Sequence, residues 1–361
     1  MSLVYGVGTK FRNMLYDQQW IASKSYPLPV ICVGNLAVGG TGKTPHTEYL
    51  IALLQSRGLQ VATLSRGYKR HTKGYLKATP QSSAQDIGDE PWQLLHNHPS
   101  ITVAVDEDRC HGIEQLMLVQ PKVDAIILDD AYQHRAVKAG LNILLTDYHR
   151  LYTRDMLLPA GRLRESQAGA KRAHIVVVTK CPTHLTEAEA NDIKAELHLL
   201  PHQQLYFSTI AYGAPQPVFA SVKSETQASP ESVSNFEYML INAQQTLFID
   251  ASCHLLAVTG IAHPEPMIDY LHSLTPNIEH ISYADHHDFT PDDLQHIQQT
   301  FAQLPEKKLI ITTQKDAARL QTFSAQLDDT FKQHLYALPI NIKLLFSQEG
   351  AFNQSILEFV D

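Results

Sequence analysis

The fold of this chain is decided by the stretch Val30-Ile-Cys-Val-Gly-Asn-Leu-Ala-Val-Gly-Gly-Thr-Gly-Lys-Thr-Pro45. An apolar run typical of a buried strand enters a glycine-rich turn, and Gly42-Lys43-Thr44 then opens a helix. In such a loop the backbone N–H groups point toward a β-phosphate, a lysine reaches the β- and γ-phosphates, and a threonine hydroxyl can hold Mg²⁺. The partial positive charge of the helix N-terminus favours the same anion. The stretch therefore predicts a nucleotide-binding site made of Ala37, Val38, Gly39, Gly40, Thr41, Gly42, Lys43 and Thr44.

The loop departs from the usual phosphate-loop pattern at its first position, where Ala37 stands in place of glycine. Alanine fits such a turn when its φ is negative. The alternative is a glycine turn that only joins a strand to a helix. That alternative does not explain why Lys43 and Thr44 occur together at the correct spacing.

Short apolar runs alternate with helical patterns along the first half of the chain. Such alternation indicates an α/β fold with a doubly wound, mostly parallel sheet covered on both faces, as in P-loop NTPases. The expected strands span 30–33, 60–64, 101–105, 125–128, 142–145 and 174–179, and the expected helices span 44–56, 107–118 and 187–199.

A second alternating segment follows a stretch rich in Pro, Ser, Ala and Gln. Thr290 and Pro291 form a good N-cap and first position for one of its helices. We therefore expect an N-terminal helical segment over 1–25, a phosphate-loop core over 26–210, a linker or hairpin over 211–250, and a smaller α/β lobe over 251–361. The expected elements of that lobe are strands 255–258, 278–283 and 308–312 with helices 264–271 and 291–301.

Two acids follow an apolar run at Asp129 and Asp130, where a strand leaves the predicted sheet. Ligands bind at this edge of α/β sheets, so with Thr44 these carboxylates are candidate Mg²⁺ ligands. The alternative is an ordinary pair of turn aspartates. The later stretch Thr179-Lys180-Cys181-Pro182 lacks the aspartate that reads guanine in GTPases, which favours ATP over GTP.

Composition restricts the class of protein. The 361 residues include 29 Lys+Arg against 37 Asp+Glu, a formal net charge of −8 that argues against a protein coating nucleic acid. Four scattered cysteines without a CxxC pair predict a reducing compartment, and neither a signal peptide nor about 18 consecutive apolar residues is present. We expect an intracellular enzyme. A local basic run over 57–77 is either a solvated face or a phosphate-binding surface.

Apolar side chains recur at helical spacing over residues 3–15. Lys10 and Arg12 lie between them, and Trp20 follows. One interpretation is a helix lying on anionic lipid; the other is a helix packed on its own domain. Periodicity alone does not separate the two.

Taken together, several segments resemble the tetraacyldisaccharide 4′-kinase (lipid A 4′-kinase) family over nearly the whole chain, least at 211–251. The matching segments are 5–6, 12–16, 33–45, 65–68, 88–91, 129–134, 158–165, 284–289 and 313–317. The resemblance implies transfer of the γ-phosphoryl group of ATP to the 4′-hydroxyl of an acylated glucosamine disaccharide 1-phosphate, giving lipid IVA. It also implies a smaller second lobe closing over the site and peripheral attachment to the cytoplasmic face of the bacterial inner membrane.

By this resemblance Asp89 is the catalytic base and His286 its partner. A carboxylate can accept the proton that a sugar hydroxyl loses during phosphoryl transfer. Without the resemblance, Gly88-Asp89-Glu90-Pro91 is typical of a turn, and the acids and histidines of 285–288 could form a metal site. The resemblance further assigns supporting roles at the active site to Glu90, Gln133, His134, Arg164, Glu165 and Arg66. Ala131-Tyr132 departs from the family's commoner Gly-Phe, which puts the placement of Gln133 in question.

Arg66, Lys69 and Arg70 could meet the 1-phosphate of the substrate or lipid headgroups. Two other functions stay open: a soluble P-loop kinase of small metabolites, and a nucleotide-switched binding ATPase. ATPases of that second class usually carry an additional lysine ahead of the loop glycines, where this chain has Val38.

Overall fold

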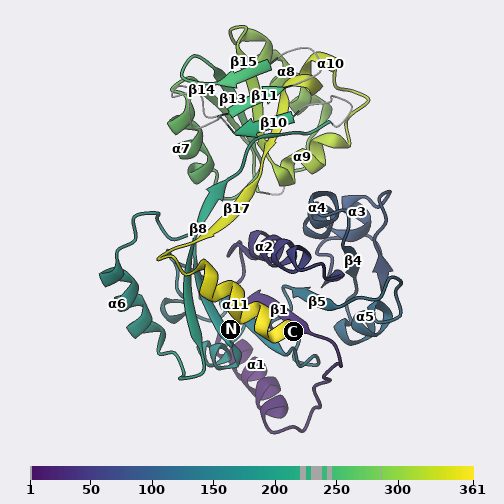
Figure 1. Ribbon diagram of the computed structural model, residues 1–361, viewed down its shortest axis with the longest axis vertical. Helices are drawn as coiled ribbons and strands as arrows, with labels where there is room; N and C mark the ends of the chain where they lie inside the picture. The colour runs from purple at the N-terminus through teal and green to yellow at the C-terminus, as the bar shows by residue number, and fades with distance from the viewer. Residues whose placement is uncertain (1, 220–224, 229–237, 242–245, 286) are drawn as a thin grey trace. The chain divides into compact units, whose positions relative to one another are not determined.

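The structure is a computed structural model that describes residues 2–219, 225–228, 238–241, 246–285 and 287–361. The chain divides into two compact units (Figure 1). Unit 1 comprises residues 1–211 and 341–361, and unit 2 comprises residues 212–340.

A nine-stranded sheet forms the centre of unit 1, as predicted for a doubly wound α/β fold. All neighbouring strands from β8 to β4 run parallel, and β3 pairs antiparallel with β4 at one edge. The strand order is β17 (Ile340–Leu344), β8 (Gln204–Tyr212), β7 (Ile175–Thr179), β6 (Leu141–Asp147), β1 (Val30–Asn35), β5 (Ala125–Asp129), β2 (Val61–Ser65), β4 (Thr102–Val105) and β3 (Leu76–Lys77).

Two hydrophobic cores cover the two faces of this sheet. Alternate residues of β1 point to opposite faces, so Cys32 joins one core and Ile31 the other. The first core packs against α5 (Arg109–Leu116), α6 (Glu187–Leu197) and the 3₁₀ segment η2 (Gln167–Arg172); the second packs against α2 (Lys43–Ser56), α4 (Asp89–Asn97) and α11 (Glu349–Val360). The short elements α3 (Ala84–Ile87) and η1 (Tyr152–Arg154) complete the unit with α1 (Ser2–Asp17). Helices on both faces explain why the strands read as continuous apolar runs.

Unit 2 is built on a five-stranded sheet that is parallel except at one edge. Its order is β14 (Ile278–Ser282), β13 (His254–Thr259), β15 (Lys308–Thr313), β16 (Leu335–Leu338) and β9 (Gln216–Pro217). Helix α7 (Glu265–Leu274) packs on one face, and α8 (Pro291–Gln303), α9 (Gln314–Gln321) and α10 (Asp329–His334) pack on the other. Thr290 caps α8 as predicted, since its side chain accepts from the Asp293 N–H while the Asp293 carboxylate accepts from the Thr290 N–H.

The two unit boundaries differ from the predicted ones. The stretch 211–250 contains an antiparallel sheet of β10 (Glu225–Ala228), β11 (Tyr238–Ile241) and β12 (Thr246–Ile249). The end of the chain, predicted to belong to the second lobe, returns to unit 1 after Ile340. The reason is apolar burial: Phe352 and Ile356 of α11 enter the same core as α2. This packing depends on residues about 300 positions apart, which local sequence patterns do not reveal.

Candidate nucleotide and phosphoryl-transfer site

The predicted phosphate loop connects β1 to α2 and is fixed by side chains around it. Inside the loop, the buried Asn35 amide donates to the Thr41 hydroxyl at 2.7 Å. From β7, the Thr179 hydroxyl donates to the Thr41 backbone oxygen at 3.0 Å. The loop is therefore held from two sides, with Lys43 and Thr44 on the first turn of α2.

The loop is also paired with a segment more than a hundred residues further along the chain. Ala37 forms an antiparallel bridge with Leu163. The Val38 N–H donates to the Arg162 oxygen at 2.8 Å, and the Arg164 N–H donates to the Leu36 oxygen at 2.7 Å. Ala37 is not among the residues with positive φ, so alanine fits this position without strain. The backbone condition stated for alanine at this position is met, and the contact of Ala37 with nucleotide stays a prediction.

A buried histidine supports the loop at Gly42. The His46 Nδ1 lies 2.7 Å from the Gly42 oxygen, and its Nε2 lies 3.0 Å from the Ser208 hydroxyl on β8. Burial lowers the pKa of His46 to about 4, so the ring is neutral at pH 7. A neutral ring with its proton on Nδ1 donates to Gly42 and accepts from Ser208, which satisfies both contacts.

Asp129 and Asp130 lie at the end of β5 beside the loop, as predicted. Asp129 is buried, and burial together with the neighbouring Asp130 charge raises its pKa to about 7. Asp130 is half-buried; its carboxylate lies 3.7 Å from the Lys43 Nζ and accepts from the Arg164 Nη1 at 3.0 Å. The structure thus brings two acids and two cations together beside the loop.

The donor set at this edge fits a divalent cation. A buried carboxylate with a second acid beside it is destabilised in its charged form, and a bound dication reverses that effect. Within the described ranges, no three His, Cys, Asp or Glu side chains converge as a self-sufficient metal site. Mg²⁺ needs only one or two carboxylates, because nucleotide phosphates and water complete its shell.

Asp89 opens a helix and does not lie in a simple turn. It is the first residue of α4, and Gly88 before it has a φ of 95°. A Cβ on Gly88 would lie 3.2 Å from the Gly67 Cα, so the loop bearing Arg66 and the start of α4 touch through their glycines. Glu90 follows Asp89, and its charge also raises the pKa of Asp129. Two motifs that are separate in the sequence therefore meet at the phosphate site.

Gln133 lies beside the loop, directly after Ala131-Tyr132. The side-chain amide nitrogen of Gln133 donates to the Asn35 backbone oxygen at 2.7 Å, next to the loop. The additional hydroxyl of Tyr132 donates to the Gly169 oxygen at 2.9 Å, so the larger side chain is satisfied. Strand β1 passes so close that a Cβ on Gly34 would lie 2.7 Å from the Tyr132 Cβ.

The remaining predicted residues fall into accessible and enclosed groups. Arg66 is exposed, and its charge acts on His134 together with that of Arg109. Burial lowers the pKa of His134, and the positive charge of Arg109 lowers it further. The His134 Nε2 is buried and has no hydrogen-bond partner in the described part of the chain. The Arg70 guanidinium is buried and bonded to Glu107 and to the Gly74 oxygen, so this member of the basic run has a structural role.

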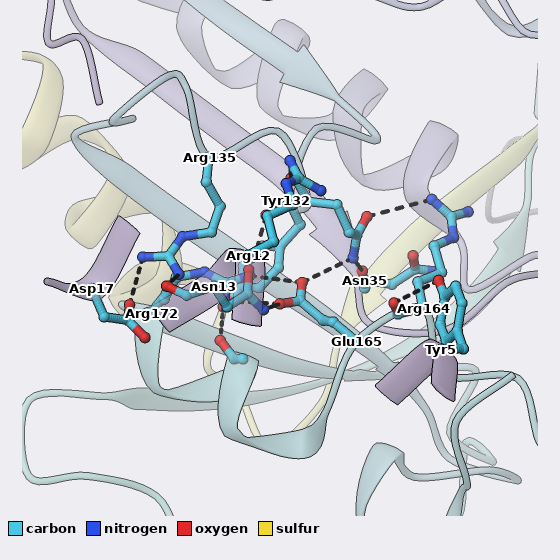
Figure 2. Close-up of polar contacts among 12 residues, drawn as sticks. Tyr5, Arg12, Asn13, Asp17, Asn35, Tyr132, Arg135, Arg164, Glu165 and Arg172 are labelled. Carbon is cyan, nitrogen blue, oxygen red and sulfur yellow. Dashed lines mark hydrogen bonds and ion pairs between the residues drawn. The ribbon is translucent and has the colours of Figure 1, made fainter. Parts of the chain in front are cut away.

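Glu165 is enclosed among other side chains, as Figure 2 shows. Four nitrogen donors surround its carboxylate, from Asn13, Gln133 and Arg172. His286, the predicted partner of Asp89, lies outside the described residues. Its neighbour His287 contacts Asp293 at 2.9 Å and stacks on Tyr283.

Several site residues were not predicted from the sequence. Asn35, His46 and Thr179 support the loop, and Asn35 and His46 lay inside or beside the motif without a recognised signal. Arg172 and Asn13 carry no local pattern at all. Only the three-dimensional contacts identify them.

Comparison with known proteins finds similar sequences over the whole chain. The sequence matches the family described as LpxK, Tetraacyldisaccharide-1-P 4'-kinase, over residues 1–361. It is 50% identical to a tetraacyldisaccharide 4'-kinase of Bacteroides thetaiotaomicron, covering 100% of this chain and 92% of that protein. It is 42% identical to the protein of the same name from Flavobacterium johnsoniae, covering 99% and 95%.

The fold is also similar to a crystal structure of LpxK from Aquifex aeolicus in complex with ATP. The TM-score is 0.71 at 28% sequence identity, and the alignment covers 100% of this chain and 97% of that one. Because the family model matches residues 1–361 and a relative is 50% identical over its length, this chain belongs to the tetraacyldisaccharide-1-phosphate 4′-kinase family.

Proposed function

We propose that this chain transfers the γ-phosphoryl group of ATP to the 4′-hydroxyl of an acylated glucosamine disaccharide 1-phosphate, a step in lipid A synthesis. The observation that carries the proposal is the arrangement of the phosphate loop with Asp129 and Asp130 at one edge of the sheet, Lys43 lying 3.7 Å from Asp130. Such a site supplies the positioning and charge stabilisation on which phosphoryl transfer depends.

Asp89 is the proposed proton acceptor. As the sugar oxygen forms its bond to the γ-phosphorus, the bond to the β-phosphate oxygen of ATP breaks, ADP leaves, and the hydroxyl proton passes to the Asp89 carboxylate. The position of Asp89 as the first residue of α4, directly after Gly88, supports this role. The partnership with His286 stays a prediction drawn from the family.

Thr44, Asp129 and Asp130 are the proposed Mg²⁺ ligands. The ion would neutralise charge on the β- and γ-phosphates. Lys43 and Arg164 supply the fixed cations of the protein at the same place.

Helix α1 is the proposed contact with the cytoplasmic face of the inner membrane. Tyr5, Arg12 and Asn13 bond to the rest of unit 1, whereas Val7 is 68% exposed and Phe11 55% exposed. Apolar side chains on the outer side of a docked helix suit an interface that also has to present a lipid substrate. No helix among the described residues combines the length and apolar character needed to span a bilayer.

A transfer assay tests the proposal. Purified protein is incubated with γ-labelled ATP, Mg²⁺ and the acylated disaccharide 1-phosphate in mixed micelles, and the product is identified by mass spectrometry. We expect a bisphosphorylated lipid, and we expect none from Lys43→Ala.

Two parallel incubations separate the alternatives. Equal labelling of a deacylated disaccharide 1-phosphate would favour a soluble small-metabolite kinase. ATP turnover that is independent of any acceptor, with nucleotide-dependent dimerisation, would favour a switch ATPase.

A further inference from the structure

Glu165 is a carboxylate whose capacity for hydrogen bonds is filled by the protein. It is 3% exposed. Its Oε1 accepts from Arg172 at 2.7 Å and from Gln133 at 3.2 Å, and its Oε2 accepts from Arg172 and from Asn13, both at 2.9 Å. A carboxylate offers about four acceptor positions, so no position is left for a metal or a phosphate-bound water. Glu165 therefore acts on the site through its neighbours.

Arg172 determines the orientation of this carboxylate. Its guanidinium makes a two-pronged contact with Glu165, donates to the Tyr132 oxygen at 3.2 Å and lies 4.7 Å from the centre of the Tyr132 ring. A planar guanidinium held in this way orients a carboxylate more strictly than a lysine ammonium does.

From Glu165, contacts lead directly to the phosphate site. Gln133 bonds to Glu165 and to the Asn35 oxygen at the loop, and its Oε1 lies 3.5 Å from the Arg164 Nη1. The same Arg164 nitrogen contacts both oxygens of Asp130, at 3.0 and 3.1 Å. The position of Gln133 thus affects a cation and an acid beside Lys43.

The other end of this network is helix α1, drawn with it in Figure 2. Besides the bond from Asn13 to Glu165, the Arg12 guanidinium donates to the Gln133 backbone oxygen at 2.9 Å, and the Tyr5 hydroxyl donates to the Arg164 backbone oxygen at 2.8 Å. Three side chains of one helix therefore contact three residues of the candidate site.

We propose that Asn13 and Arg172 are positioning residues for phosphoryl transfer: by fixing Glu165 they set Gln133 and Arg164, so the seating of α1 controls the geometry of the phosphate site. This inference rests on the proposed function, because it takes Arg164 and Asp130 as part of the reacting centre. It makes α1 a part of the catalytic apparatus as well as a contact with lipid.

A double-mutant cycle tests the inference. Asn13→Ala should lower kcat roughly five- to twentyfold, in line with the loss of one hydrogen bond to a charged group. The Kd for ATP and binding to anionic vesicles should stay unchanged, and the melting temperature should fall by no more than a few degrees, the cost of leaving one Glu165 acceptor position unpaired. In a Glu165→Gln background the same substitution should change kcat less than twofold, because Asn13 acts through the carboxylate. Thr9→Ala is the matched control, since among the described residues the Thr9 hydroxyl bonds only to α1 backbone oxygens.

A second variant covers the case in which the Glu165 background is too weak to measure. Arg172→Lys keeps the charge but loses the two-pronged contact, so kcat should fall several-fold at constant ATP affinity. Equal effects of Asn13→Ala in both backgrounds, or wild-type kcat in Asn13→Ala and Arg172→Lys, would overturn the inference. Lys43→Ala separates this failure from a failure of the proposed function, because only the latter lets Lys43→Ala keep activity.

Discussion

At the scale of single residues, the adjacent acids Asp129 and Asp130 have different surroundings. Asp129 is buried against Thr47, whereas Asp130 is one-third exposed and paired with Arg164. Burial and the neighbouring charge raise the pKa of Asp129 from 3.8 to about 7. A carboxyl group with a raised pKa holds its proton more tightly in the folded protein than in the unfolded chain. Its contribution to the free energy of unfolding is therefore fully present below pH 4 and is lost as the pH rises toward 7.

Asp129→Asn should stabilise the nucleotide-free protein while abolishing phosphoryl transfer. At pH 8 the substitution removes a buried charge, so the free energy of unfolding should rise by roughly 2 to 4 kcal/mol. At pH 4 the difference should disappear, because Asp129 is then protonated. Urea unfolding at both pH values measures the effect, with Asp192→Asn on the surface of α6 as control. A variant less stable than the wild type at pH 8 would show that Asp129 is not destabilised by its surroundings.

His46 illustrates a second residue-scale effect, the support of a backbone oxygen in the phosphate loop. His46→Ala removes the donor to Gly42 and leaves the Ser208 hydroxyl unpaired. We expect the Kd for ATP to rise roughly three- to tenfold, the usual value of one net hydrogen bond. Equilibrium dialysis with His184→Ala, an exposed histidine, as control measures this change. Unchanged ATP affinity would mean that the loop keeps its shape without the ring.

At the scale of secondary-structure elements, loops from distant parts of the chain form the site. The segment 162–164 pairs with the phosphate loop, and Gly67 contacts Gly88 at the start of α4. These contacts depend on backbone approach, so small changes at the glycines should displace the functional side chains beside them.

Gly88→Ala tests that dependence. Its φ of 95° is unfavourable for alanine, and the added Cβ would press on the Gly67 backbone. We expect a loss of roughly 1 to 3 kcal/mol in the free energy of unfolding and at least a tenfold drop in kcat as Asp89 moves. Gly58→Ala is the matched control, with a φ of 78° but open space around its Cβ. It should lose stability without losing kcat; equal kcat values in the two variants would contradict the role given to Gly88.

The sequence was sufficient for the elements whose signals are local. The strands near 30, 61, 125, 143 and 175 are predictable because they are continuous apolar runs, whose side chains enter both cores. Lys43 and Thr44 were predicted because the loop chemistry requires them at fixed spacing. The capping of α8 by Thr290 was read from two adjacent residues.

Features that depend on distant contacts were missed or left open. The sequence Gly88-Asp89 is typical of a turn. The structure shows that Gly88 contacts Gly67 and that α4 begins at Asp89. No local sequence pattern indicates that α11 returns to unit 1, or that Arg172 donates hydrogen bonds to Glu165. For the N-terminal helix, periodicity left two interpretations, and only its contacts with Gln133 and Arg164 revealed how it is held.

At the scale of the whole molecule, the described candidate residues all belong to unit 1, and helix α1 belongs to the same unit. Unit 1 therefore combines the phosphate site with the exposed apolar side chains proposed to meet the membrane. Residue 286 falls within the sequence range of unit 2, so the predicted partner of Asp89 would come from that unit.

Replacing Val7 and Phe11 together by serine should weaken binding to anionic vesicles at least tenfold, because both side chains are more than half exposed on α1. The melting temperature should not fall, since neither side chain is buried in the fold. Vesicle sedimentation measures the binding, and Leu118→Ser, a 74% exposed residue beyond α5, is the control. Vesicle binding equal to that of the wild type would place the lipid contact elsewhere.

We propose above that Asp89 accepts the proton of a sugar hydroxyl while the phosphate loop holds ATP. The most direct test compares kcat and the Kd for ATP of Asp89→Asn with those of the wild type, using the acylated disaccharide 1-phosphate as acceptor. We predict that kcat falls by roughly two to four powers of ten while ATP binds within about twofold of the wild-type affinity. Turnover close to that of the wild type would contradict the claim.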